Sequence, residues 1–200
     1  MASTYTDLGI ELMATGENAG TWGTKTNNNL NLIEQLTGGF ATLSIAGGAG
    51  TQALDIDDGA LTGTAQQRII EFTGSITGNR IITIPNDVET FYILKNSTSG
   101  AYTVQFKYAT GSGSSTTFSA TDKGIKTVYA SANDGTNPDI VDVMANSSEI
   151  VLANNNPIKF NDADNSAFVG IDAPATVSGS YTLTLPAAVG SASQALVTTD

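Results

Sequence analysis

The stretch Thr21–Gly39, TWGTKTNNNLNLIEQLTGG, carries the strongest helix signal in a chain otherwise made of strand and turn patterns. Leu30, Ile33 and Leu36 recur every three residues, which predicts an apolar stripe on a helix of about 14 residues. A helix this short buries too little surface by itself. We therefore expect its stripe to contact another surface.

The two ends of this helix carry further signals. Thr24 and Thr26 can cap the first turn with their hydroxyls, and Gly38 and Gly39 are expected to stop the helix in the left-handed conformation. Trp22, the only tryptophan, is expected just before the helix. It has two interpretations, packing on its own helix or anchoring a partner, and the small size of the segment favours the partner.

Composition excludes several classes of function. The 200 residues carry a net charge of −11, which argues against nucleic acid and an anionic membrane surface as partners. Neither cysteine nor histidine is present, so disulfides, thiolate metal sites and the commonest general base are absent. The first twenty residues lack a signal peptide, and no stretch has the length of a membrane span. We expect synthesis in a cytosol and no membrane insertion.

Residues 1–39 form the first predicted region, an attachment segment. Alternating apolar residues from Leu8 to Leu12 predict a short extended arm with one apolar edge, and a turn-rich break at Thr15–Gly20 separates it from the helix. We predict that arm and helix fasten the protein to a partner. The expected contact residues are Leu8, Ile10, Leu12, Trp22, Leu30, Ile33 and Leu36.

Residues 40–146 form the second region, in which short strands alternate with turn clusters such as Asn96–Gly100. Near-regular spacing of these strands predicts an antiparallel β-sandwich, in a protein that is mainly β. The expected strands cover residues 40–45, 52–56, 68–72, 80–84, 91–94, 102–108, 125–130 and 139–144.

Residues 147–200 form the third region, the start of a β-rich shaft. Short strands are expected at 149–152, 158–160 and 167–171, and Tyr181, Leu183 and Leu185 alternate with threonines. The region has too few large apolar residues to fold as one copy. We therefore predict a trimer in which Tyr181, Leu183 and Leu185 face a common axis.

Two acidic turns are candidate cation sites. Asp55–Gly59, DIDDG, begins like a calcium loop, but an EF-hand needs glutamate at its twelfth position, where Gln66 stands. An acidic turn is the simpler interpretation there and at Asn161–Asn165, where a cation between chains stays an open alternative. We predict no metal site and no cofactor.

The sequence predicts a non-enzyme with no catalytic residue. Carboxylates are numerous, but no spacing selects a pair for glycoside hydrolysis, and a nucleophilic serine would lack its histidine. The glycine-rich runs Gly47–Gly50 and Gly111–Gly113 do not have the spacing of phosphate-binding loops.

Within residues 7–39, the segments Asp7–Leu12, Gly16–Gly20, Thr21–Asn27 and the helix to Gly38 follow one another in a recognisable order. They resemble the N-terminus of tail-fibre and related virion proteins of tailed bacteriophages, especially short-tailed phages of marine bacteria. Two further parts resemble the middle module and the shaft of such fibres. They are Tyr92–Val104 with Val128–Asp134, and Ser180–Pro186 continuing through Gln194–Asp200.

The resemblance implies a homotrimeric structural protein of the virion, made in the host cytoplasm, joined to other tail or neck proteins and supporting host-cell recognition. A more distal region would contact a host surface glycan or protein. In the shaft pattern of such fibres, a glycine-rich turn and a further strand follow the segment that matches Thr198–Asp200. We therefore expect this chain to be the proximal part of a longer fibre.

Two alternatives stay open. A carbohydrate-binding β-sandwich module would show aromatic side chains along one exposed sheet face, although Tyr102, Phe106 and Tyr108 fit an inward face equally well. A tailspike depolymerase would show a carboxylate cluster in a groove between chains.

Overall fold

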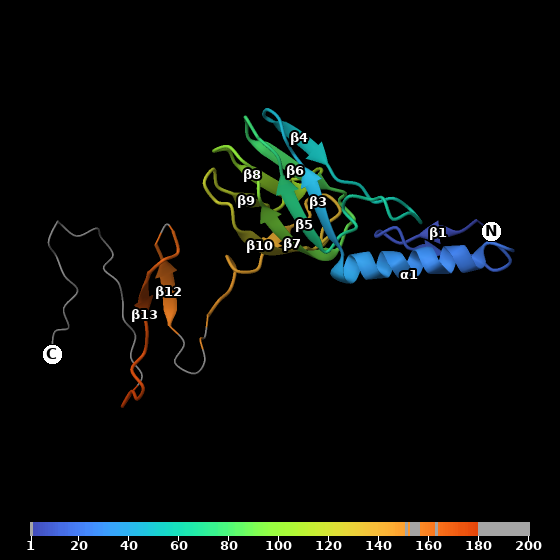
Figure 1. Cartoon of the computed structure of the whole chain (residues 1–200). Coiled ribbons are helices and arrows are strands. Elements are labelled where there is room, and N and C mark those ends of the chain that lie inside the picture. The colour runs from blue at the N-terminus through green and yellow to red at the C-terminus, as the bar shows by residue number, and fades with distance from the viewer. Residues whose placement is uncertain (1, 151, 153–156, 163, 180–200) are drawn as a thin grey trace. The chain divides into compact units, whose positions relative to one another are not determined.

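The structure, a computed structural model, describes residues 2–150, 152, 157–162 and 164–179 (Figure 1). The chain forms two compact units, residues 1–148 and 149–200. The protein is mainly β with one helix and several sheets, which confirms that part of the prediction.

The first unit holds the helix and most strands. Its elements in chain order are β1 (Thr4–Tyr5), β2 (Glu11–Leu12), α1 (Trp22–Gly38), β3 (Phe40–Ser44), β4 (Gly50–Ala53), β5 (Ile69–Thr73), β6 (Arg80–Ile84), β7 (Thr90–Asn96), β8 (Val104–Tyr108), β9 (Thr116–Phe118), β10 (Ile125–Ala130) and β11 (Ile140–Asp142). The predicted strands at 80–84 and 125–130 match β6 and β10, whereas β9 has no predicted counterpart.

The helix differs from its prediction at both ends. It spans 17 residues and begins at Trp22, and among the described residues no side chain caps its start, which corrects the caps expected at Thr24 and Thr26. Gly39 is extended, with φ −65°, rather than left-handed. A glycine is needed there because a Cβ would lie 2.6 Å from the carbonyl oxygen of Gln35.

Two sheets make up the body of the first unit. One has the strand order β11-β10-β7-β5-β3 and the other β4-β6-β8-β9 (Figure 1). From β3 to β8, consecutive strands alternate between the sheets, so that β3, β5 and β7 pair in parallel, as do β4, β6 and β8. The chain therefore makes three stacked coils, which β9, β10 and β11 extend by antiparallel pairing.

The predicted antiparallel pairing is thus wrong for β3 to β8. Turn clusters such as Asn96–Gly100 carry the chain from one sheet to the other instead of folding it back as a hairpin. Alternating apolar residues indicate which side chains share a face, but parallel and antiparallel neighbours produce the same alternation. The strand pattern therefore could not distinguish the two topologies.

The coils stack closely at their corners. Gly100 has φ +97°, and a Cβ at this position would collide with the carbonyl oxygen of Ile76 in the preceding coil. Gly78 likewise lies against the backbone of Ala49. Ile45 and Ile76 are buried at two of these corners, so the corners belong to the core.

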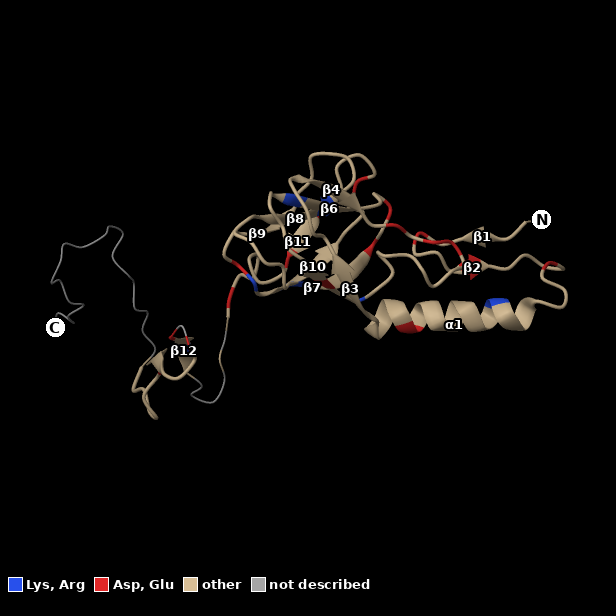
Figure 2. Ribbon diagram, turned by 45° about the horizontal axis from the view of Figure 1, so that its top comes forward, with Lys and Arg blue, Asp and Glu red and all other residues tan. Residues whose placement is uncertain are grey.

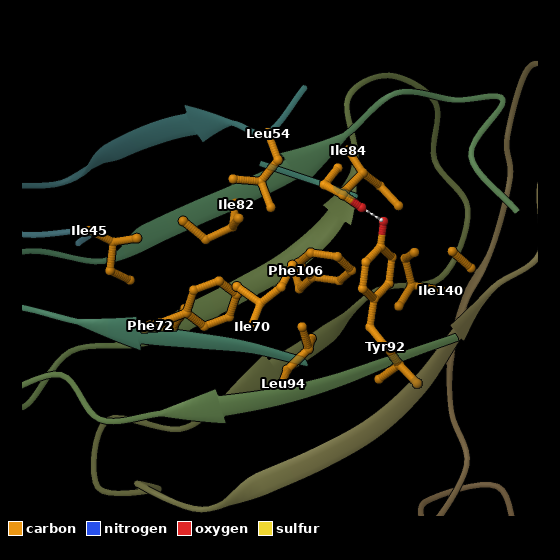
Figure 3. Close-up of a cluster of buried hydrophobic side chains, with 14 of the residues drawn as sticks. Ile45, Leu54, Ile70, Phe72, Ile82, Ile84, Tyr92, Leu94, Phe106 and Ile140 are labelled. Atoms are coloured by element: carbon orange, nitrogen blue, oxygen red, sulfur yellow. Dashed lines mark hydrogen bonds between the residues drawn. The ribbon is translucent and has the colours of Figure 1, made fainter. Parts of the chain in front are cut away.

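The core lies between the two sheets (Figure 3). Phe106 from β8 contacts Phe72 and Tyr92 from the facing sheet, with ring centroids 6.5 and 5.5 Å apart. The hydroxyl of Tyr92 donates to the carbonyl oxygen of Ala65 at 2.8 Å, which satisfies a group that burial would otherwise penalise. Burial also raises the pKa of Tyr92 above its ordinary value.

The second unit contains β12 (Ile158–Asn161) and β13 (Phe168–Ile171), which form an antiparallel hairpin. Ile158 lies opposite Ile171, and Phe160 lies opposite Val169, so four apolar side chains share one face. All four are exposed, Val169 to 73%. The residues predicted for the trimer interface, Tyr181, Leu183 and Leu185, lie outside the described residues.

Candidate attachment surface

The N-terminal arm folds back on itself instead of extending. β1 pairs with β2, and the backbone N–H of Thr6 donates to the carbonyl oxygen of Ile10 at 3.0 Å. Gly9 lies in this turn with φ +76°, a conformation that favours glycine. The expected extended arm from Leu8 to Leu12 is therefore a small hairpin, because the glycine at its centre permits a turn.

The arm is fixed to the β-sheet body by a buried glutamine. The side chain of Gln66 donates to the carbonyl oxygen of Leu8 at 3.0 Å. The backbone N–H of Gly59 donates to the carbonyl oxygen of Gly9 at 2.8 Å. Leu8 also packs against the core. Gln66, which stands at the twelfth position of the possible calcium loop, thus holds the arm in place.

The helix holds the other side of the arm. Asn29 accepts from the N–H of Glu11 at 3.0 Å and donates to its carbonyl oxygen at 2.9 Å, so that one side chain pairs with a whole backbone unit. Glu11 is buried, and its carboxylate lies 2.9 Å from the Lys25 ammonium. This contact lowers the pKa of Glu11 and raises the pKa of Lys25.

The same side of α1 contacts the loop before β5. Asn28 donates to the carbonyl oxygen of Gly59 at 3.4 Å, and Gln35 donates to that of Leu61 at 3.2 Å. Leu32 and Leu36 are buried on this side. The inner side of the helix is therefore occupied by contacts within the chain.

A second apolar stripe on α1 faces outward. Trp22, Thr26, Leu30 and Ile33 follow one another at spacings of four, four and three, which places them on one side of the helix. Trp22 is 60% and Leu30 59% exposed. Met13 extends the stripe, because it lines a shallow depression together with Trp22 and Thr26. We call these five residues the outer stripe.

The outer stripe carries no charge of its own. Within α1 the charged residues are Lys25, on the inner side, and Glu34. Figure 2 shows the helix ribbon almost free of charged residues, whereas several acidic residues lie in the arm and the adjoining loops. Glu17, which lines the same depression as Met13, Trp22 and Thr26, is the charged residue at its edge. The apolar side chains of the stripe themselves carry no charge, so the stripe suits burial against an apolar partner surface.

The predicted contact residues are divided between the two sides. Leu12, Trp22, Leu30 and Ile33 are exposed, Leu8 and Ile10 are partly buried, and Leu36 is buried. Leu36 thus does not share a stripe with Leu30 and Ile33, because the helix buries residues near Leu32 and exposes those around Leu30. Their role as attachment residues stays a prediction.

The sequence pattern did not single out Glu11, Asn29 and Gln66 as the residues that hold the arm. One signal was available: Asn27–Asn29 places three poor helix formers in the middle of a helix, at a cost in propensity. Two of these asparagines make the contacts with the arm and the loop.

The acidic turns engage their own loops. Asp55 accepts from the N–H of Thr64 at 3.0 Å and from its hydroxyl, and these bonds lower the pKa of Asp55. Asp162 accepts from the N–H and hydroxyl of Ser166. Among the residues that the structure describes, no group of three or more carboxylates is placed to hold a metal ion.

Several carboxylates line a shallow depression between the arm and the body, including Asp7, Asp55, Asp58 and Asp87. A general acid for glycoside hydrolysis needs a raised pKa, whereas the pKa of Asp55 is lowered. Asp55 is therefore unsuited to that role.

In the part of the chain that the structure describes, no helix is long and apolar enough to cross a membrane. Comparison of the chain with models of protein families, with curated proteins and with solved structures finds no match.

Proposed function

We propose that this protein is a structural component of a phage virion, the tail fibre or its virion-attached portion, and that the outer stripe of α1 binds another tail or neck protein. The observation that carries the proposal is the two-sided helix. Its inner side is occupied by the arm and the loop before β5, while Trp22, Leu30 and Ile33 are held out in solvent.

The hydrogen bonds of the arm make this surface ready for binding. Asn29, Gln66 and the Glu11–Lys25 ion pair fix the arm against both the helix and the body. A surface that is already ordered loses less conformational entropy when it binds. Such a helix fits an apolar groove of its partner, where Trp22 and Leu30 would serve as anchors.

We further infer that residues 147–200 form a homotrimeric shaft and that the two facing sheets of residues 40–146 act as a sandwich-like spacer. The hairpin face of Ile158, Phe160, Val169 and Ile171 supports the trimer, because a lone two-stranded hairpin with an exposed apolar face is marginally stable. Further copies can cover this face.

We assign no catalytic activity. The chain has no histidine or cysteine to supply a base or a nucleophile near neutral pH. Incubation with host polysaccharide is expected to release no reducing ends. Release that is lost in an Asp58→Asn or Asp87→Asn variant would instead support the tailspike depolymerase.

The attachment proposal is tested with virions assembled without this protein. Purified protein should bind them, and Trp22→Ala should weaken binding by about 3 kcal/mol or more if the indole is buried at the contact. Leu30→Glu should abolish binding, because it would bury an unpaired charge.

The matched control is Asn31→Glu, which adds the same charge to an exposed position of α1 outside the outer stripe. It should bind like the unaltered protein. Equal binding by the Leu30→Glu and Asn31→Glu proteins, both folded by circular dichroism, would refute the assignment of the stripe.

A further inference from the structure

The outer face of the five-stranded sheet, which points away from the core, is a second apolar surface. Its outward residues include Phe40 on β3, Ile69 on β5, Phe91 and Ile93 on β7, Tyr129 on β10 and Val141 on β11. Phe40 is 57% and Phe91 49% exposed. We call these six residues the sheet-face patch.

Strand register makes the patch continuous. Phe40, Ile69 and Ile93 lie opposite one another on three adjacent strands, a row that spans about 10 Å. Tyr129 lies opposite both Phe91 and Val141 in the next row, and the rings of Phe91 and Tyr129 have centroids 6.0 Å apart. Large side chains of five strands therefore form one surface.

The charge of this face is balanced. Within these five strands, all of which the structure describes, the charged residues that point outward are Glu71 and Lys95, and they form an ion pair at 2.8 Å. The face is therefore neutral on a chain of net charge −11. Two copies that meet here avoid the like-charge repulsion that acts between most of their other surfaces.

We propose that the sheet-face patch binds the same patch of a second copy of this chain. A continuous apolar surface over five strands is typical of an interaction site. Two such faces can stack as sheets do in a protein core. The contact is isologous, since each copy contributes the same residues, so in a trimeric protein it joins chains of two different trimers rather than chains around one three-fold axis.

The neighbours of the aromatic pair disfavour a glycan as the occupant. A sugar site combines stacking rings with polar groups that fix the hydroxyls. Within the strands, the outward residues that adjoin Phe91 and Tyr129 are Ile93, Val141 and Thr127, and of these Thr127 alone offers a polar side chain. The patch therefore fits an apolar protein surface better.

This inference goes beyond the proposed function, because it concerns neither the outer stripe nor residues 147–200. A chain ending at Ser148 separates it from the proposed shaft. All members of the core cluster lie between residues 8 and 140, so this shorter chain keeps the whole core. Its self-association then reports on the first unit alone.

The first experiment uses the absence of cysteine. Thr127→Cys places one thiol on the outer face, in the row of Ile93, and Thr51→Cys places one on exposed β4 of the other sheet. With a short bismaleimide, full-length Thr127→Cys should form covalent dimers and Thr51→Cys should not. Equal linkage of both proteins, or linkage of neither, would overturn the proposal.

The second experiment measures self-association of the chain ending at Ser148 by sedimentation equilibrium. Phe91→Lys should raise the dissociation constant at least tenfold, whereas Tyr102→Lys, at an exposed aromatic outside the patch, should leave it unchanged. A shorter chain that stays monomeric while the full chain is trimeric would refute this interface and leave the proposed shaft intact. Binding of the monomer to immobilised polysaccharide, lost in Phe91→Ala, would overturn the proposal in favour of a glycan site.

Discussion

Strand β8 and the β12–β13 hairpin have the same sequence pattern in opposite surroundings. In β8, Val104 and Phe106 alternate with polar residues and are buried, because a second sheet faces them. In β12, Ile158 and Phe160 also alternate with polar residues, yet both are exposed. Alternation thus determines which residues share a face, while a second layer determines whether that face leaves water.

The largest effect is expected for the C-terminal unit by itself. Residues 147–200 expressed alone should be disordered, because a lone hairpin buries too little apolar surface to offset its chain entropy. The same residues fused to a trimerising coiled coil should show strand signal in circular dichroism. A sharp unfolding transition of the unfused fragment, independent of concentration, would contradict both this prediction and the shaft proposal.

The buried strand of this comparison, β8, can be destabilised with one substitution. Phe106→Ala removes a ring packed against Phe72 and Tyr92, and should lower the free energy of unfolding of the first unit by about 3–5 kcal/mol. Phe160→Ala is the matched control and should change that transition by less than about 0.5 kcal/mol. Chemical denaturation of the full chain measures both, and similar losses from the two variants would be inconsistent with the comparison.

The stacking of the coils can be tested at a corner. Gly100→Ala introduces a Cβ that collides with the carbonyl oxygen of Ile76, at a backbone with φ +97°, and should destabilise the first unit by about 1–3 kcal/mol. Gly135→Ala is the control, since a Cβ there has open space and ordinary φ. If thermal melting shows the two variants to be equally stable, the parallel stacking at this corner is wrong.

The smallest effect concerns the arm, which is held mainly by polar contacts. The bond to Lys25 lowers the pKa of Glu11, so its stabilisation is present above about pH 4.3 and is lost as pH falls through the folded-state value. The raised pKa of Lys25 has the opposite consequence. Its stabilisation is present below about pH 10.4 and is lost as pH rises through the folded-state value.

The backbone N–H of Glu11 donates to the side-chain oxygen of Asn29. Its protection from hydrogen exchange therefore measures how firmly the arm is held against the helix. Protection should be greatest between these two limits and should fall outside them. Lys25→Met should remove most of the pH dependence, whereas Lys107→Met, on β8, should preserve it. An unchanged pH profile in Lys25→Met would exclude the ion pair as the cause.

The corners of the coils share a short sequence motif that is visible in the sequence itself. Three corners begin with serine and end with glycine three residues later, and each lies where the chain leaves one sheet for the other. These corners are Ser44–Gly47, Ser75–Gly78 and Ser97–Gly100. The second residues, Ile45, Ile76 and Thr98, are all buried. This recurrence indicates a coil more directly than the strand pattern does.

The sequence by itself determined the helix in residues 21–39, most strand positions and the absence of cysteine and histidine chemistry, because these depend on local periodicity and composition. Only the tertiary structure decided that β3 to β8 pair in parallel and that Leu36 faces inward while Leu30 faces out. It also revealed Gln66 and Asn29 as the residues that hold the arm. Such contacts join residues far apart in the chain, and local pattern carries no information about which distant backbone group a side chain will meet.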